Sequence, residues 1–113
     1  MNPSLTATTS PPLARRIGDI MLPRLRRLAE AHPEIGDVRG RGAMIAIELV
    51  RPGTLEPDPA TTAKVAKACH AAGLVVLTCG TFGNVLRFLP PLVISEALLD
   101  EGLSILEEAF AAR

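Results

Sequence analysis

The chain contains few aromatic residues. Its 113 residues include three Phe and no Trp or Tyr, so aromatic residues make up only 3% of the sequence. Hydrophobic residues nevertheless account for 48%, and any core must therefore be built from aliphatic side chains. A single domain of this length buries roughly 65% of the surface of its unfolded chain. Such an aliphatic composition indicates that a partner covers part of the apolar surface.

The sequence also lacks an excess of charge of either sign. Twelve Lys and Arg balance twelve Asp and Glu, and a neutral chain has no general attraction for nucleic acid or for an anionic membrane. No segment is apolar over the length that a bilayer requires. We therefore expect neither nucleic acid nor a membrane as a partner. The arginines near the N-terminus are interpreted as a solvated helix face: Arg15, Arg16, Arg24, Arg26 and Arg27.

Only two cysteines are present, and they do not form a CxxC motif. Cys69 and Cys79 are therefore expected to be free thiols in a reducing compartment, which favours a cytoplasmic location. Cys69 and His70 are neighbours on a predicted helix, so their side chains point about 100° apart and would not chelate one ion. We predict no metal site and no nucleophilic cysteine.

The N-terminus lacks the basic start and apolar run of a secretory signal. Residues 1–12 are mostly polar and include three prolines, which predicts a disordered leader. Residues 13–113 are then expected to form one domain.

Hydrophobic periodicity predicts three helices. The first covers 13–31, with Ser10 as its N-cap and with a kink or a split at Pro23. The second begins after the N-cap Asp58 and stops at Gly73, and its expected buried face carries Val65, Cys69 and Ala72. The third follows Ser95 as N-cap, and its apolar stripe consists of Leu99, Leu103, Leu106 and Phe110.

Three apolar segments are predicted as strands: 43–50, 74–77 and 85–89. The last two should form a hairpin. The crossover through the second helix should place the first strand beside this hairpin. Gly40 and Gly42 precede the first strand and indicate a bulge or tight turn. The predicted order α-β-α-β-β-α gives an α+β fold, a small three- to four-stranded mixed or antiparallel sheet with helices packed on one face.

One arginine lies within the last apolar strand. Alternation places Val85, Arg87 and Leu89 on one face of that strand, and Leu86 and Phe88 on the other. Long charged side chains usually reach water, so Arg87 could simply face solvent from a half-buried strand. A guanidinium in apolar surroundings also suits two-point binding of a carboxylate or phosphate. The sequence pattern leaves both alternatives open.

Three motifs in order resemble a known family: GDVRGRGAMIAIEL at 36–49, AGLVVL at 72–77 and CGTFGNVLRFLPPL at 79–92. They are similar to the C-terminal small domain of class III pyridoxal-phosphate aminotransferases, most of all to the members that act on 4-aminobutyrate. The resemblance implies the small domain of a fold type I enzyme, a homodimer and pyridoxal phosphate as cofactor. It also implies amino transfer between 4-aminobutyrate and 2-oxoglutarate, with Arg87 pairing with the substrate carboxylate.

The match departs from the family in what this chemistry needs. The only lysines are Lys64 and Lys67, where the family has no Schiff-base lysine, and the large cofactor-binding domain is missing. We therefore expect a fragment that has no catalytic residue, binds no cofactor by itself, is inactive alone and has the large domain as its partner. The alternative hypothesis is a stand-alone α+β module that binds a small ligand or dimerises, without catalysis.

Overall fold

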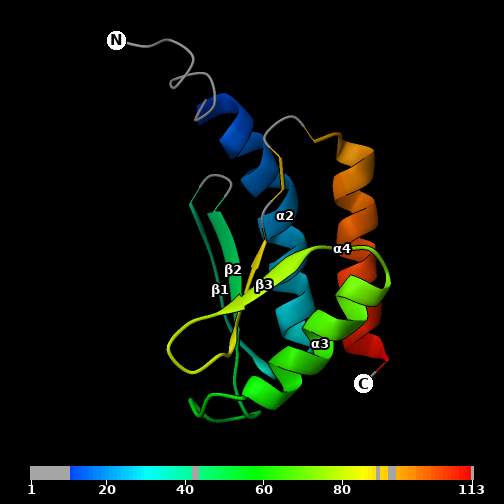
Figure 1. The fold of residues 1–113 in the computed structure, drawn as a ribbon. Coiled ribbons are helices and arrows are strands. Elements are labelled where there is room, and N and C mark those ends of the chain that lie inside the picture. The colour runs from blue at the N-terminus through cyan, green and yellow to red at the C-terminus, as the bar shows by residue number, and fades with distance from the viewer. Residues whose placement is uncertain (1–10, 42–43, 89, 92–93, 113) are drawn as a thin grey trace.

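The computed structural model describes residues 11–41, 44–88, 90–91 and 94–112. The elements follow the order α-β-β-α-β-β-α and form an α+β fold (Figure 1). Their bounds are α2 Pro11–Ala31, β1 Ile35–Arg41, β2 Met44–Leu49, α3 Pro59–Ala71, β3 Val76–Cys79, β4 Val85–Phe88 and α4 Glu96–Ala111. The predicted fold class is confirmed, but the predicted order lacked β1.

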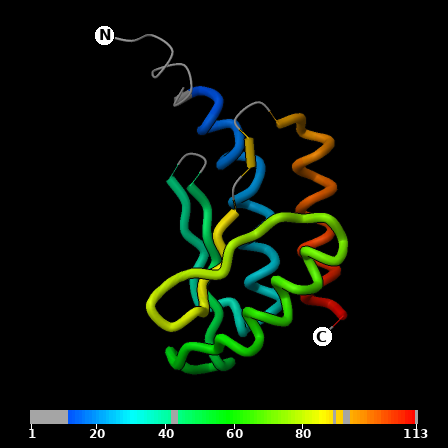
Figure 2. The backbone as a smooth tube through the Cα atoms, viewed as in Figure 1, coloured from blue at the N-terminus to red at the C-terminus, as the bar shows by residue number. Residues whose placement is uncertain are grey.

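The sheet is antiparallel throughout, with the strand order β1-β2-β4-β3. The chain makes two hairpins, β1–β2 and β3–β4, and α3 connects them so that β2 lies beside β4. Figure 2 shows β1 and β2 as a pair of adjacent segments next to the shorter β4. The predicted hairpin is confirmed, and β4, the strand that carries Arg87, is an inner strand of the sheet.

The helices cover one face of the sheet. Helices α2 and α3 contact the strands, and α4 packs against both of these helices. The core between them is mostly aliphatic, its described aromatic members are Phe88 and Phe110, and Ile47, Leu86 and Leu106 are fully buried in it. The apolar stripe predicted for α4 is confirmed, since Leu99, Leu103, Leu106 and Phe110 are all buried. Burial of so many branched aliphatic side chains is the main stabilising contribution to this fold.

Two predicted helix caps are present. The Asp58 carboxylate accepts hydrogen bonds from the Thr61 backbone N–H at 3.0 Å and from the Thr61 hydroxyl at 2.7 Å. These bonds lower the pKa of the Asp58 carboxyl below its ordinary value of 3.8. The Ser95 hydroxyl accepts from the Leu98 N–H at 3.2 Å and caps α4. The predicted cap at Ser10 lies outside the described residues.

Strand β1 was not predicted from the sequence. Arg41 pairs with Met44, so the tight turn predicted before β2 falls on residues 42 and 43, which lie outside the described residues. The inward face of β1 carries glycine where a strand usually carries an apolar side chain. A Cβ added at Gly40 would lie 3.0 Å from Leu22 of α2, and one at Gly36 would lie 2.7 Å from Val50. The backbone of β1 therefore approaches α2 and the end of β2 closely, and glycine is what permits this contact.

Helix α2 is not split at Pro23. It is one helix of 21 residues that contains this proline. Pro23 is exposed, so water can bind the carbonyl that loses its helical donor, while Ile17, Met21 and Leu25 anchor the opposite face in the core. The helix begins at Pro11, two residues inside the predicted leader, whose residues 1–10 are not described. In α3, Ala72 follows the helix and is exposed, contrary to the prediction, whereas Val65 and Cys69 are buried as predicted.

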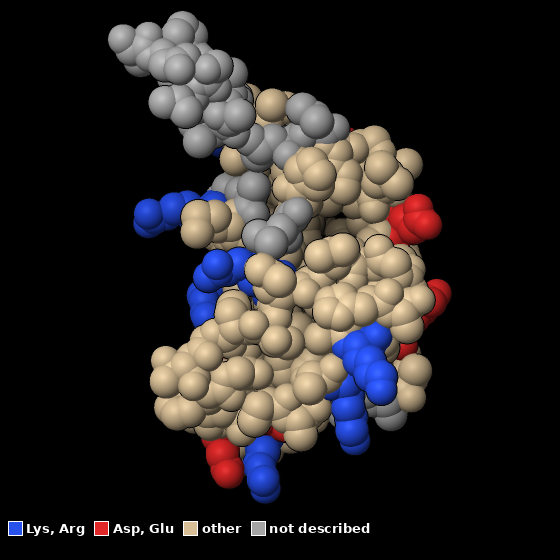
Figure 3. All heavy atoms as spheres, in the orientation of Figure 1, with Lys and Arg blue, Asp and Glu red and all other residues tan. Residues whose placement is uncertain are grey.

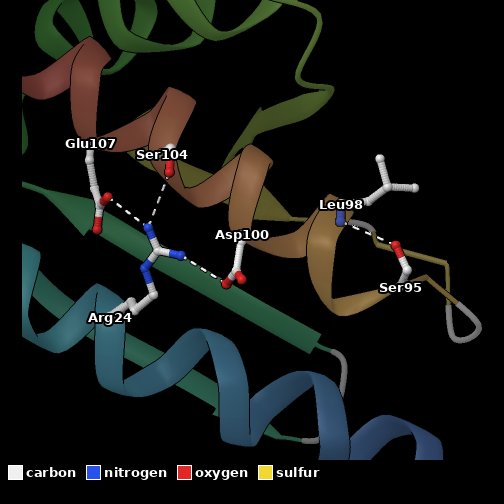
Figure 4. Close-up of polar contacts among 6 residues, drawn as sticks. All are labelled: Arg24, Ser95, Leu98, Asp100, Ser104 and Glu107. Carbon is white, nitrogen blue, oxygen red and sulfur yellow. Dashed lines mark hydrogen bonds and ion pairs between the residues drawn. The ribbon is translucent and has the colours of Figure 1, made fainter.

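The arginines of α2 are not all solvated. Arg24 reaches across to α4, where it binds Asp100 at 3.1 Å, Glu107 at 2.8 Å and Ser104 at 3.4 Å (Figure 4). Arg16 donates a hydrogen bond to the Ile94 carbonyl. These two side chains therefore tie α2 to α4 and to the segment before it, which corrects the prediction of a purely solvated face.

None of the helices in the described ranges is long and apolar enough to cross a membrane.

Candidate carboxylate-binding face

Arg87 lies on the face of the sheet that α2 and α3 leave open. Its neighbours along β4, Leu86 and Phe88, are buried against the helices, whereas Arg87 is exposed. The alternation predicted from the sequence is therefore confirmed for these three residues. This position keeps the guanidinium hydrated in the isolated domain, which accounts for a charged side chain in an otherwise apolar strand.

A row of side chains crosses the open face at the level of Arg87. Ala46 of β2 and Leu77 of β3 are its direct partners in the two flanking strands, and Arg39 of β1 is the partner of Ala46. Because neighbouring strands are roughly 4.8 Å apart, the Cα atoms of Arg39 and Arg87 are separated by roughly 10 Å. Two cations thus flank a single methyl side chain.

The charges on this face are unevenly balanced. Arg39 pairs with Asp37 at 2.9 Å and lies 3.9 Å from Glu48. Arg41, two residues further along β1, is exposed as well. No hydrogen bond or ion pair within the described ranges involves the side chain of Arg41 or Arg87. The face consequently offers two uncompensated guanidinium groups to an incoming anion.

A hollow of about 460 Å³ lies over this part of the sheet. In Figure 3, basic side chains gather at the edge formed by β1 and β2, beside an uncharged surface. The hollow is lined by Arg39, Gly40, Arg41, Met44, Ile45, Ala46, Cys79, Gly80, Val85 and Arg87. Its composition, three arginines around small and apolar residues, suits a small anion with a short aliphatic body.

Gly80 shapes one border of this hollow. Its φ of +88° is in the left-handed region that glycine tolerates, and a Cβ there would lie 2.9 Å from Val85 Cγ2. Any side chain at this position would strain the turn after β3 and displace Val85, which lines the hollow together with Arg87. The sequence indicated a turn here but gave no sign that the glycine borders a site.

The cysteine and histidine residues lie apart from this chemistry. Cys69 is fully buried, and burial raises the pKa of its thiol to about 11. His70 Nε2 lies 2.9 Å from the Val76 carbonyl and joins α3 to β3. Cys79 is half-buried at the edge of the hollow. No group of three metal-ligating side chains occurs among the described residues.

A second, smaller hollow has a different character. Its volume is about 170 Å³, and it lies between α4 and the segments that flank β3 and β4. It contains no charged residue and is lined by Met21, Leu74, Val75, Phe88, Pro90, Pro91, Ile94, Leu98, Leu99, Gly102, Leu103 and Leu106. Val75 and Leu98 at its rim are 70% and 56% exposed, so this chain leaves a considerable apolar surface uncovered.

Comparison with known proteins assigns the family. The model of the family described as Aminotransferase class-III matches residues 8–110. The chain therefore belongs to this family of pyridoxal-phosphate-dependent enzymes. A 4-aminobutyrate aminotransferase of Mycobacterium leprae is 61% identical over 93 residues, which are 82% of this chain and 21% of that protein. A 5-aminovalerate aminotransferase of Pseudomonas putida is 46% identical over 98 residues, 87% of this chain and 23% of that protein.

The fold is shared with solved structures of the family. A phospholyase from Arthrobacter in complex with phosphoethanolamine superimposes with a TM-score of 0.83 at 31% identity, over 88% of this chain and 24% of the phospholyase. The chain spans about a fifth of the length of the two aminotransferases to which it was compared above. The resemblance found in the sequence motifs is confirmed.

The described residues do not fit a pyridoxal phosphate site. Lys64 and Lys67 are exposed on α3, and α3 packs on the face of the sheet opposite to Arg87. Neither lysine lines either hollow. An amine placed there cannot reach a ligand that Arg87 holds, so no chemical step of the cofactor is assigned to this chain.

Proposed function

We propose that this chain is the C-terminal small domain of an aminotransferase that exchanges an amino group between 4-aminobutyrate and 2-oxoglutarate, and that Arg87 binds the substrate carboxylate. One observation carries the proposal: Arg87 is exposed on the open face of the sheet and has no partner among the described residues. A planar guanidinium with free donors is suited to a carboxylate.

The proposed substrate class rests on the names of two relatives and on the position of Arg87. The two relatives act, by their names, on 4-aminobutyrate and 5-aminovalerate, whose amine and carboxylate lie at opposite ends of a short aliphatic chain. A carboxylate held by Arg87 would direct the amine away from the sheet, toward a cofactor bound by another domain. Fixing both ends of the substrate in this way removes rotational freedom before the reaction begins.

The partner that completes the site is the large cofactor-binding domain. The open face presents Met44 and Leu77, which are 71% and 47% exposed, next to the arginines that would bind substrate. Exposed apolar side chains around a polar centre favour contact with another protein surface. We propose that this surface is covered in a homodimeric enzyme in the cytoplasm, and that the small domain alone is inactive.

A hybrid enzyme tests the proposal. Residues 13–113 would replace the matching segment of the M. leprae 4-aminobutyrate aminotransferase, and transamination of 4-aminobutyrate with 2-oxoglutarate would be measured. We expect an active hybrid and an inactive isolated chain. A folded hybrid that binds cofactor and does not transaminate would contradict the proposal. So would a stoichiometric complex of the isolated chain with pyridoxal phosphate that is lost on Lys64→Ala or Lys67→Ala.

A further inference from the structure

We propose, independently of the function above, that the outer edge of β3 is a self-association surface of this chain and that His70 limits its use. In this arrangement β3 of a second copy adds to the sheet in the antiparallel direction, with Leu77 of one copy opposite Leu77 of the other. The two four-stranded sheets then form one continuous sheet about a twofold axis.

The backbone of β3 has hydrogen-bonding groups that its own sheet does not use. The carbonyl of Asn84, directly before β4, accepts a hydrogen bond from the last residue of β2 at 2.8 Å. Successive residues of a strand direct their backbone groups to opposite sides, so Arg87, three residues later, directs its groups to β3, where it pairs with Leu77. Val76 and Thr78, on either side of Leu77, therefore direct their backbone groups to the outer edge.

The side chain of His70 gives independent evidence for this orientation. Its Nε2 lies 2.9 Å from the Val76 carbonyl, one of the outward groups, and donates a hydrogen bond to it. Within the described ranges, no hydrogen bond involves the outward N–H or carbonyl of Thr78, and Thr78 is exposed. His70 thus occupies one position of the edge and leaves the next one open to another strand.

The two edges of the sheet, β1 and β3, are protected to different degrees (Figure 1). Strand β1 carries three charged residues, Asp37, Arg39 and Arg41, and its pairing with β2 is irregular between Ile35 and Asp37. Charges and irregularities of this kind hinder the addition of another strand. Strand β3 has neither a charge nor a proline, and its register with β4 is regular. It is therefore the edge on which addition meets less hindrance.

The chemistry of the β3 edge fits a second copy of the same chain. Residues 71–86 include no charged residue, and in Figure 3 the surface over β3 and the turn after it is mostly uncharged. Val75 and Leu77 are 70% and 47% exposed, and the proposed pairing covers both with uncharged side chains. The two Arg87 residues, each one strand further in, are three strand spacings or roughly 14 Å apart, where salt screens most of their repulsion.

Sedimentation of the 113-residue chain at increasing concentration tests this inference. We expect a monomer–dimer equilibrium. Thr78→Pro removes an outward N–H without breaking a bond to β4, and should raise the dissociation constant at least about tenfold. Thr78→Ala, the matched control that keeps this N–H, should change it by no more than about twofold. His70→Ala frees the Val76 carbonyl and should lower it by about three- to tenfold.

Cross-linking tests the register without relying on the folding of Thr78→Pro. Leu77 and its copy would form a pair without mutual hydrogen bonds, whose Cα atoms are roughly 4.5 Å apart and within the range of a disulfide. In a Cys79→Ser background, Leu77→Cys should therefore give a disulfide-linked dimer on mild oxidation. Met44 is more exposed than Leu77 but lies on β2, two strands away from this edge, so Met44→Cys should give much less.

Three results would overturn the inference. The first is a chain that stays monomeric up to about 1 mM, with and without His70→Ala. The second is a dimer that persists in Thr78→Pro when circular dichroism and Tm show this variant to be folded. The third is cross-linking through Met44→Cys that equals cross-linking through Leu77→Cys, because association would then occur through the open face of the sheet.

Discussion

Arg87 and Ala46 lie directly opposite each other where β4 pairs with β2. The alanine contributes one methyl group beside the guanidinium, and both residues line the hollow on the open face. A larger side chain at Ala46 would fill the space beside Arg87 in which we propose that the carboxylate binds. The pairing therefore makes position 46 a direct probe of the proposed site.

Ala46→Glu should weaken substrate binding by placing a carboxylate of the protein opposite Arg87. A glutamate opposite Arg87 would form a cross-strand ion pair, which stabilises a sheet by about 0.2–1 kcal/mol, and would compete with substrate. We expect the KM for 4-aminobutyrate in the hybrid enzyme to rise at least about tenfold, with an unchanged or slightly higher Tm. Ala46→Gln, which is similar in size and uncharged, should have a smaller effect. Equal effects of the two substitutions would indicate that steric blockage alone is responsible.

The Asp58 cap should make stability depend on acid pH. The pKa of Asp58 is lowered in the folded chain because the carboxylate accepts two hydrogen bonds from Thr61. Its contribution is therefore present above about pH 4 and is lost as the pH falls through the lower, folded value. At pH 7, Asp58→Ala should reduce the free energy of unfolding by about 1 kcal/mol in urea titrations. The difference from wild type should shrink at pH 3, whereas Asp58→Asn should retain most of the cap.

Arg24 should contribute to stability more than its exposed neighbours do. Its side chain is 21% exposed and connects α2 to Asp100 and Glu107 of α4. Arg24→Ala should lower the free energy of unfolding by about 1 kcal/mol. Arg26→Ala, on the exposed side of the same helix, should change it by less than about 0.5 kcal/mol. Concentrated salt should reduce the Arg24 effect, and equal effects of the two substitutions would contradict the role of Arg24.

The two thiols should react at different rates. Burial raises the pKa of Cys69 to about 11, and the side chain is fully buried, so little thiolate forms and reagent has no access. Cys79 is half-buried at the hollow. At pH 8 we expect a thiol reagent to modify Cys79 first and Cys69 only after denaturation. Cys79→Ser should abolish the fast reaction, and persistence of that reaction would show that Cys69 is accessible.

The sequence predicts the fold well where apolar residues recur with a clear period. Strand β4 and the stripe of α4 were found because Leu86, Phe88, Leu103 and Leu106 follow the spacing of a strand or a helix. Strand β1 was missed because its inward face carries Gly36 and Gly40, which the close approach of Val50 and Leu22 requires. That requirement arises from tertiary packing and leaves no hydrophobic signal.

The candidate site could be predicted only in part for a related reason. Arg87 was identified because a charge stands out in an apolar strand. Arg41 lies in a polar segment, and its place in the hollow depends on the register of β1 with β2. Alternation of Asp37, Arg39 and Arg41 with glycine and valine was the only available signal. The contacts of Arg24 with α4 likewise connect residues far apart in the sequence, which periodicity cannot reveal.

The central claim, that Arg87 binds the substrate carboxylate, is tested most directly by Arg87→Ala in the hybrid enzyme, with kcat/KM for 4-aminobutyrate and Tm measured on the same sample. Loss of a charge-assisted pair in an enclosed site costs about 2–5 kcal/mol, so kcat/KM should fall about 30- to 4,000-fold. The Tm should hardly change, because Arg87 is exposed in this domain. Near-normal catalytic efficiency in the folded variant, or a large loss of Tm with activity retained, would contradict the assignment.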